Sequence, residues 1–157
     1  MRIFLLQRKR NKGETTALLN TIEQQFRIKY SEIMEDFQCI EYDLKRIYSA
    51  MSADDFDDNM DMLEFSNMGR TLKWLEEMDN SDGNPYLSEA EYDTLHTIRE
   101  LRNYWAHQCF LDWVYCHDNW EKQNNLQRKY NRLVNESNRV SKLQRKLERF
   151  YLDTFCD

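Results

Sequence analysis

The chain has 157 residues, 41% of them hydrophobic, and a net charge of −6, which fits a single domain, residues 1–157, with its own core. Aromatic residues at 13% exclude a disordered chain, and no apolar run approaches the roughly 20 residues that a membrane-spanning helix needs. Only three Gly and one Pro are present, which excludes a fold of many hairpins and predicts an all-α protein built of long helices.

The first third of the chain predicts a long amphipathic helix. Its opening apolar residues, 3–6, are too few for a signal peptide and are followed by basic residues, so we expect a cytoplasmic protein. From Leu19 to Met51 apolar residues recur at steps of three or four, which is the stripe of one helix face. We expect one break in this helix, near Arg27–Lys29.

A second helix is predicted after Ser52–Asp55, where a polar cap is followed by acidic residues. These acids lack the glycine and the ligand spacing of a calcium loop. The apolar residues of this segment predict one continuous helix from Met60 to Leu75. Gly69 lies inside it and would allow the close approach of another backbone.

The clearest loop is Asp79–Pro85, rich in Asn, Asp, Ser and Gly. Ser88–Glu91 then forms a capping box that opens a third helix, predicted over approximately residues 88–117. A break near Cys116–Asn119 precedes the last helix, whose near-heptad apolar pattern is interrupted around Glu136–Ser137.

Charge is distributed unevenly along the chain. Residues 52–93 carry thirteen acidic and two basic residues, and residues 121–149 carry nine basic and three acidic ones. The basic segment either binds a polyanion such as RNA or pairs with the acidic helices. The candidate RNA-binding residues are Arg128, Lys129, Arg132, Arg139 and Arg145.

The residues with the clearest chemical potential lie in the third helix. Arg102, Asn103 and His107 follow one another within one and a half turns, with Glu100 just before them. Arginine holds phosphate, and histidine exchanges protons near neutral pH. RNA cleavage needs both functions, although any charged helix surface can also carry an Arg and a His.

Helical geometry separates the two central side chains. At about 100° per residue, Glu100, Asn103 and His107 lie within about 60° of one another, whereas Arg102 lies about 140° from His107. Either the arginine stem wraps around the helix or a second copy completes the site. This geometry leads us to expect a homodimer with its pocket between two motif helices.

The sequence around these residues resembles the HEPN superfamily, whose signature is an Arg followed by four to six residues and a His. Asn103 matches the polar residue that the family prefers after the Arg, and Glu100 stands two before Arg102, as is common there. The segment Gly69–Leu72, a short loop and Leu87–Tyr92 resemble the approach to that motif in small stand-alone members. The similarity covers roughly residues 60–115.

The resemblance implies an up-and-down bundle of four or five helices and a metal-independent endoribonuclease, with a toxin or phage-defence effector as the role considered. His107 would act as general base or acid, Arg102 would stabilise the phosphate, Asn103 would hold the phosphate or orient His107, and Glu100 would orient one of them or serve as a structural ion-pair partner. RNA and an antitoxin or complex partner are the implied partners. The family's AMP-accepting Tyr, two places after the His, is replaced by Cys109.

Other interpretations remain open. Some members of the family are non-catalytic, so a helical RNA-binding or adaptor module is the alternative, and a purely structural dimer is a third. Cys109, Cys116 and a nearby His could hold a metal, but the spacing fits no usual zinc pattern, and we expect four buried, reduced cysteines and no metal. No phosphate-cradling glycine loop is present, and we expect no cofactor.

Overall fold

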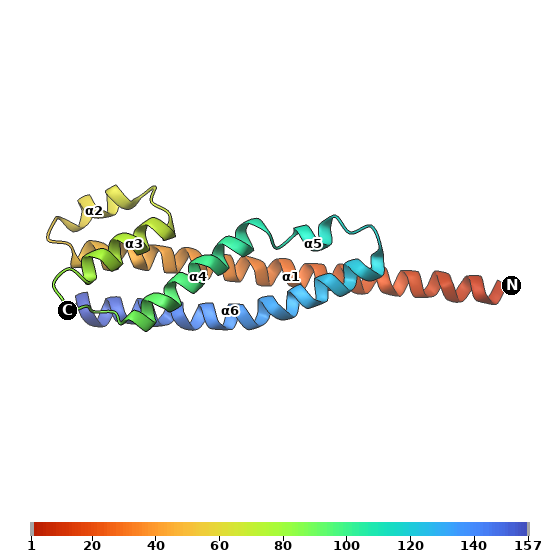
Figure 1. Ribbon diagram of the computed structural model, residues 1–157. Coiled ribbons are helices and arrows are strands. Elements are labelled where there is room, and N and C mark those ends of the chain that lie inside the picture. Colours follow the sequence, from red (N-terminus) through yellow and green to blue (C-terminus); the bar gives the residue numbers. More distant parts are fainter. Residues whose placement is uncertain (1, 157) are drawn as a thin grey trace.

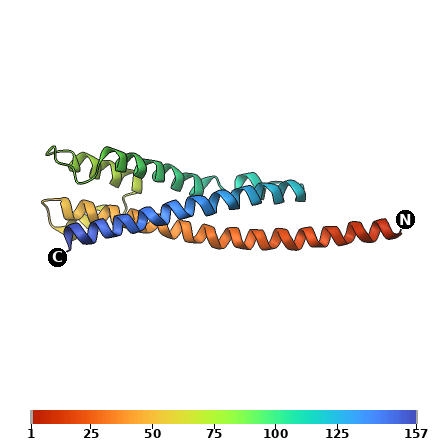
Figure 2. The same cartoon turned by 90° about the horizontal axis from the view of Figure 1, so that it is seen from below.

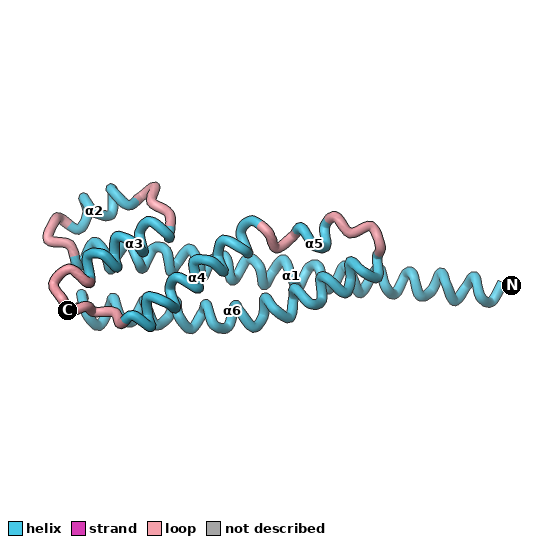
Figure 3. Tube along the Cα trace, in the orientation of Figure 1, coloured by secondary structure: helices cyan, strands magenta, loops and turns pink. Residues whose placement is uncertain are grey.

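The computed structural model describes the backbone of residues 2–156 and the side chains of residue 19 and residues 21–156. In this part of the chain helices are joined by loops and no strand is present (Figure 3), which confirms the all-α fold class. The helices are α1 (Arg2–Met51), α2 (Phe56–Leu63), α3 (Met68–Asp79), α4 (Glu89–His107), α5 (Leu111–Val114) and α6 (Asn119–Phe155).

The two long helices α1 and α6 lie side by side and run in the same direction, and the first turns of α1 extend beyond the rest of the molecule (Figures 1 and 2). The shorter helices α2 to α5 lie along this pair, and α4 crosses it obliquely in the opposite direction (Figure 1). Side chains of the two helices contact each other at several points. Ser141 of α6 donates to the Asp36 carboxylate of α1, and the Arg46 guanidinium of α1 lies 3.8 Å above the Tyr151 ring of α6.

The apolar stripe of α1 is buried as predicted, but the expected break near Arg27–Lys29 is wrong. The helix continues through this segment because Phe26 and Ile33 on either side of it are fully buried at helical spacing. The charged residues between them stay on the outer face, where Arg27 pairs with Glu23 at 2.7 Å.

The single helix predicted from Met60 to Leu75 is two helices, α2 and α3, joined at Glu64–Asn67. Local polar groups explain the turn. The side chain of Asn67 accepts a hydrogen bond from the Arg70 amide and caps α3, and the buried Ser66 hydroxyl lies 2.9 Å from that of Thr71. Such side chains offer the backbone an alternative to continuing the helix.

The predicted loop and capping box are both present between α3 and α4. The Ser88 amide and hydroxyl each donate to the Glu91 carboxylate at 2.8 Å. The predicted helix over 88–117 is too long, however, since α4 ends at His107 and a separate short α5 follows.

The chain bends after His107 because aromatic side chains beyond it are drawn into the core. The rings of Phe110 and Trp113 each lie 5.8 Å from the ring of Phe26, and Cys109, directly before Phe110, is also buried. Position 107 is therefore the last residue of a helix and not part of its middle.

The final helix begins at Asn119, capped by Asp118, as the sequence predicts. The polar interruption at Glu136–Ser137 does not break it. Ser137 is buried at the α6 core face, and Glu136 accepts a 2.7 Å hydrogen bond from the indole nitrogen of Trp105 on α4.

Candidate functional site

Most of the predicted motif lines a single pocket. A hollow of about 270 Å³ between the first turn of α3 and the last turns of α4 is lined by Asn67, Met68, Gly69, Arg99, Arg102, Asn103 and His107. We call it the Arg102 pocket. The apolar residues of α4, such as Ile98 and Trp105, are buried in the core, so the opposite, polar side of the helix faces this hollow.

The two central side chains therefore reach the same pocket within one chain. The angular separation of Arg102 and His107 on α4 does not prevent this, because arginine has a long stem that can bend around the helix. A second copy is not needed to bring them to one pocket. The homodimer remains a prediction, but its geometric motivation is gone.

The guanidinium of Arg102 is oriented without being fully engaged. One terminal nitrogen lies 3.9 Å from a carboxylate oxygen of Glu41 on α1, and the other lies 3.5 Å from the side-chain oxygen of Asn103. Both contacts are long for charge-assisted hydrogen bonds, which are typically near 2.8 Å. The N–H groups of Arg102 are thus available to a phosphate, and its side chain is 31% exposed.

His107 is exposed at the end of α4 and lines the Arg102 pocket. Its imidazole is accessible to solvent and to a substrate entering the pocket. Asn103 is also exposed, and because its oxygen faces Arg102, its amide nitrogen is free to donate to an incoming oxygen. An imidazole, a guanidinium and a side-chain amide therefore line one pocket.

Glu100 lies outside this arrangement. It does not line the Arg102 pocket, and its carboxylate pairs with the guanidinium of Arg99. The alternative role for Glu100, a structural ion-pair partner, is the one that the geometry fits. Any influence of Glu100 on the pocket passes through Arg99.

Four lining residues, Asn67, Met68, Gly69 and Arg99, were not predicted from the sequence as part of the site. Arg99 precedes Asn103 by four residues, so it lies on the same side of α4, and a helical projection would have found it. Asn67, Met68 and Gly69 come from the start of α3; the resemblance included Gly69 in the approach to the motif, but nothing in the sequence placed it beside Arg102. Gly69 allows a close approach, but of a side chain: a methyl group there would lie 3.2 Å from the Arg99 side chain.

The predicted RNA-binding residues divide into two groups. Arg128, Lys129 and Arg132 line a second hollow, about 420 Å³, together with Asp112 and Asn125, which we call the Lys129 pocket. Arg139 and Arg145 are exposed farther along α6 and belong to neither pocket.

Two of the three basic residues in the Lys129 pocket also serve the fold. Burial disfavours the charge of Lys129, but hydrogen bonds to Asp112 and to the Tyr104 hydroxyl outweigh this effect, so that the pKa of Lys129 is raised. Arg132 bonds Glu136 at 2.8 Å and lies 4.1 Å above the Tyr104 ring. Arg128 is exposed and, among the described contacts, bonds only Asn125.

Pairing between the acidic and basic segments accounts for little of their charge. Among the ion pairs of the described residues, Lys146 with Glu91 is the one that joins segment 121–149 to segment 52–93. The other basic residues of α6 are largely left to face solvent or a ligand.

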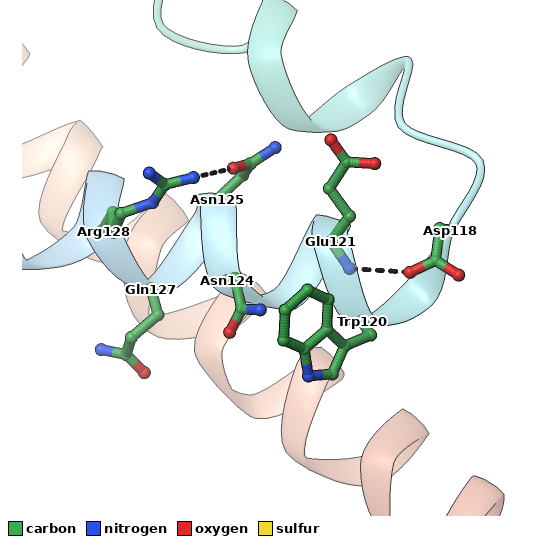
Figure 4. A pocket seen from close by; sticks show the side chains of 7 residues that line it. All are labelled: Asp118, Trp120, Glu121, Asn124, Asn125, Gln127 and Arg128. Carbon is green, nitrogen blue, oxygen red and sulfur yellow. Dashed lines mark hydrogen bonds between the residues drawn. The ribbon is translucent and has the colours of Figure 1, made fainter.

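A third hollow, about 690 Å³, lies along the first turns of α6 (Figure 4). Trp120 stands at its edge and is 72% exposed, whereas Trp105 and Trp113 are core residues, as their helical spacing predicts. In Figure 4 the Trp120 ring lies beside Asn124, while Asn125 and Arg128 lie together on another side of α6. Trp120 is the tryptophan best placed to stack on a base.

The cysteines fit the prediction only in part. Cys109 is buried and its thiol donates to the Trp105 carbonyl, and burial raises the pKa of Cys109 to about 11. Cys39 and Cys156 are exposed and Cys116 is partly exposed, so the expectation of four buried thiols is wrong. Among the described residues, no group of three or more His, Cys, Asp or Glu side chains is arranged to hold a metal ion.

Comparison with known proteins gives no match: no family model fits the chain, and no curated protein and no solved structure is similar to it. The resemblance to the HEPN superfamily therefore rests on the sequence features of residues 60–115 alone. No described helix has both the length and the apolar character that a bilayer crossing requires.

Proposed function

We propose that the protein is an endoribonuclease that acts in the Arg102 pocket without a metal ion. The observation that carries this proposal is the presence of Arg102, Asn103 and His107 around one solvent-accessible hollow in a single chain. These are the three kinds of group that phosphodiester transfer to a neighbouring hydroxyl requires: a permanent cation, a neutral donor and a proton carrier.

The reaction follows from these groups. The 2′-hydroxyl of the RNA attacks the adjacent phosphorus, the bond from phosphorus to the 5′-oxygen breaks, and a 2′,3′-cyclic phosphate and a 5′-hydroxyl form. His107 takes the proton from the 2′-oxygen or supplies one to the leaving oxygen, and solvent completes the proton balance. Arg102 stabilises the charge that develops on the phosphorane, and Asn103 donates to one of its oxygens.

The Lys129 pocket offers a place for the neighbouring part of the strand. Lys129 of α6 bonds the Tyr104 hydroxyl of α4. Tyr104 precedes His107 by three residues, so the side chains of Tyr104 and His107 are neighbours on α4. A strand held at His107 can therefore place a further phosphate near Arg128. Such contacts add affinity without sequence preference.

The biological role in this proposal comes from the HEPN resemblance alone. It is that of a cytoplasmic toxin or phage-defence effector that an antitoxin or another complex partner holds inactive.

Cleavage of RNA in EDTA tests the proposal. We expect the wild type to release products ending in a 2′,3′-cyclic phosphate, His107→Ala to be slower by about 10²–10⁴-fold, and Arg102→Ala by about 10²–10³-fold. His96→Ala is the matched control, because His96 lies on the same helix but bonds Glu76 at 2.9 Å, away from the pocket. Equal cleavage by the wild type and both pocket variants would refute the proposed nuclease activity.

The second candidate is a non-catalytic RNA-binding module, which the basic lining of the Lys129 pocket favours. In that case no cleavage occurs, and RNA binding survives His107→Ala. Arg128→Ala would weaken binding for every sequence and reduce the slope of log affinity against log salt by about one.

A further inference from the structure

A fourth hollow, separate from the proposed nuclease site, lies between the first half of α4 and the second half of α6. Its volume is about 260 Å³, and we call it the Leu143 pocket. It is lined by Leu87, Glu91, Thr94, Leu95, Lys142, Leu143, Lys146, Leu147 and Phe150, none of which lines the Arg102 pocket.

The interior of the Leu143 pocket is apolar and fixed in place. Leu87, Leu95 and Leu147 are at most 5% exposed and belong to the hydrophobic core. Phe150 is held edge-on by the ring of Phe155 at 5.9 Å. Because these walls are anchored, the hollow is present before any ligand arrives, and a ligand need not pay for ordering it.

The mouth of the pocket carries a surplus of positive charge. From α6 come Lys142 and Lys146, and from α4 come Glu91 and Thr94. Lys146 bonds Glu91 across the mouth at 2.6 Å, and this bond together with those from Ser88 lowers the pKa of Glu91 to about 2.

Glu91 therefore neutralises Lys146. Lys142 is exposed and makes no ion pair with any other residue of the described chain, so its charge is uncompensated. The Thr94 hydroxyl donates to the Ala90 carbonyl and brings no charge. An anion at this mouth would meet one free ammonium group.

We propose that the Leu143 pocket binds an amphipathic carboxylate, with its hydrocarbon tail among the leucines and its carboxylate at Lys142. The volume of about 260 Å³ is close to nine times the ~30 Å³ that one water molecule occupies in the liquid. A chain of about eight carbons fits this space. A cationic amphiphile with the same tail would meet Lys142 with like charge.

A series of straight-chain carboxylates tests the tail. Titration of the full chain with butanoate, hexanoate and octanoate, followed by amide chemical shifts, should give one site that includes Thr94, Leu95 and Leu143. Each added methylene should tighten binding by about fourfold, so that octanoate, with four more, binds roughly 250-fold more tightly than butanoate. Affinity that does not depend on tail length, or shift changes elsewhere on the molecule, overturns the proposal.

Charge variants test the head group. Lys142→Glu should weaken octanoate at least tenfold, while Lys73→Glu, a charge reversal at an exposed lysine of α3 that is 71% accessible, should leave the affinity unchanged. Octyltrimethylammonium should bind the wild type at least tenfold more weakly than octanoate. Equal affinity for the two amphiphiles would show a hydrophobic hollow without selectivity for an anion and overturn the proposal.

A substitution that fills the pocket and a measurement of the oligomeric state complete the test. Thr94→Trp, at an exposed position on the rim, should abolish octanoate binding while circular dichroism shows the helix content retained. Sedimentation of the wild type and Thr94→Trp distinguishes the competing occupant: a dimer that dissociates only in the variant would mean that a second copy fills the pocket, and the carboxylate proposal would then fail.

Discussion

At the scale of single residues, Asp79 connects two helices through the loop between them. Its buried carboxylate accepts hydrogen bonds from the Tyr86 amide at 2.8 Å, the Leu87 amide at 3.0 Å and the Tyr92 hydroxyl at 2.8 Å. Burial and the bond to Asp79 raise the pKa of Tyr92 strongly, so the phenol stays protonated and remains a donor. These bonds fix the path of the loop and thereby the position at which α4 begins.

We predict that Asp79→Ala destabilises the protein by about 3 kcal/mol, because it leaves buried donors unsatisfied and removes bonds to a charged acceptor. Tyr92→Phe removes only one of the three bonds and should cost about 1–2 kcal/mol. Urea denaturation at neutral pH compares the two variants. The slope of unfolding free energy against urea concentration should be the same in both as in the wild type. A loss in Asp79→Ala no larger than that in Tyr92→Phe would contradict this account.

At the scale of helices, α4 and α6 are joined by a polar contact in an otherwise apolar region. The indole nitrogen of the fully buried Trp105 donates to Glu136, whose other oxygen accepts from Arg132 at 2.8 Å. The polar break in the apolar pattern of α6 therefore has a structural purpose. It fixes the end of α4, and with it the position of His107.

Glu136→Ala should destabilise the protein by about 1–3 kcal/mol, because the Trp105 indole loses its acceptor inside the core. Glu136→Gln keeps a side-chain oxygen for the indole and should cost less than half as much. Denaturation followed by tryptophan fluorescence measures both. Equal losses in the two variants would assign the effect to the Arg132 pair instead of the indole.

The interface of α1 and α6 contains a buried acid that opposes folding at neutral pH. Asp43 is 3% exposed, and one of its oxygens has no hydrogen-bond partner. Burial raises its pKa above the ordinary value of 3.8, even though the other oxygen accepts from Arg46 at 3.1 Å. The folded state thus binds a proton more readily at Asp43 than the unfolded state does.

Stability should therefore fall as pH rises through the raised pKa of Asp43. We predict that Asp43→Asn is more stable than the wild type at pH 7, since an amide resembles the protonated acid and carries no charge. The difference should shrink as pH is lowered toward 4. Unfolding free energies measured at several pH values check this, and a constant difference would refute it.

At the scale of the whole molecule, one chain supplies every group of the Arg102 pocket. The parallel pair of α1 and α6 forms the frame (Figures 1 and 2), and residues at the start of α3 and along α4 line the pocket. The protein can associate into dimers without any residue crossing from one site to the other. This separates the present geometry from a site shared between two motif helices.

Mixing two inactive variants distinguishes the arrangements. If the pocket is complete in one chain, Arg102→Ala and His107→Ala remain inactive when they are unfolded together and refolded as a mixture. A site that combines Arg102 of one copy with His107 of another would instead regain roughly a quarter of the wild-type activity. Recovery of that size would restore the shared-site model.

The amino-acid sequence by itself determined the helical class, the buried stripe of α1, the loop after α3, the capping box and the start of α6. Each of these depends on periodicity or on hydrogen bonds between near neighbours, which are local. It also singled out Arg102, Asn103 and His107, because a cation, an amide and an imidazole at this spacing suit phosphate chemistry and resemble a known motif.

Only the tertiary structure decided where α4 ends and which residues share the pockets. The bend after His107 comes from aromatic packing on Phe26, and no glycine or proline marks it in the sequence. Asn67 and Gly69 join the motif from the start of another helix. The long side chain of Arg102 lines the same pocket as His107, although the two positions point in different directions on an ideal helix. Contacts between distant segments depend on how whole helices pack, and a local pattern does not carry that information.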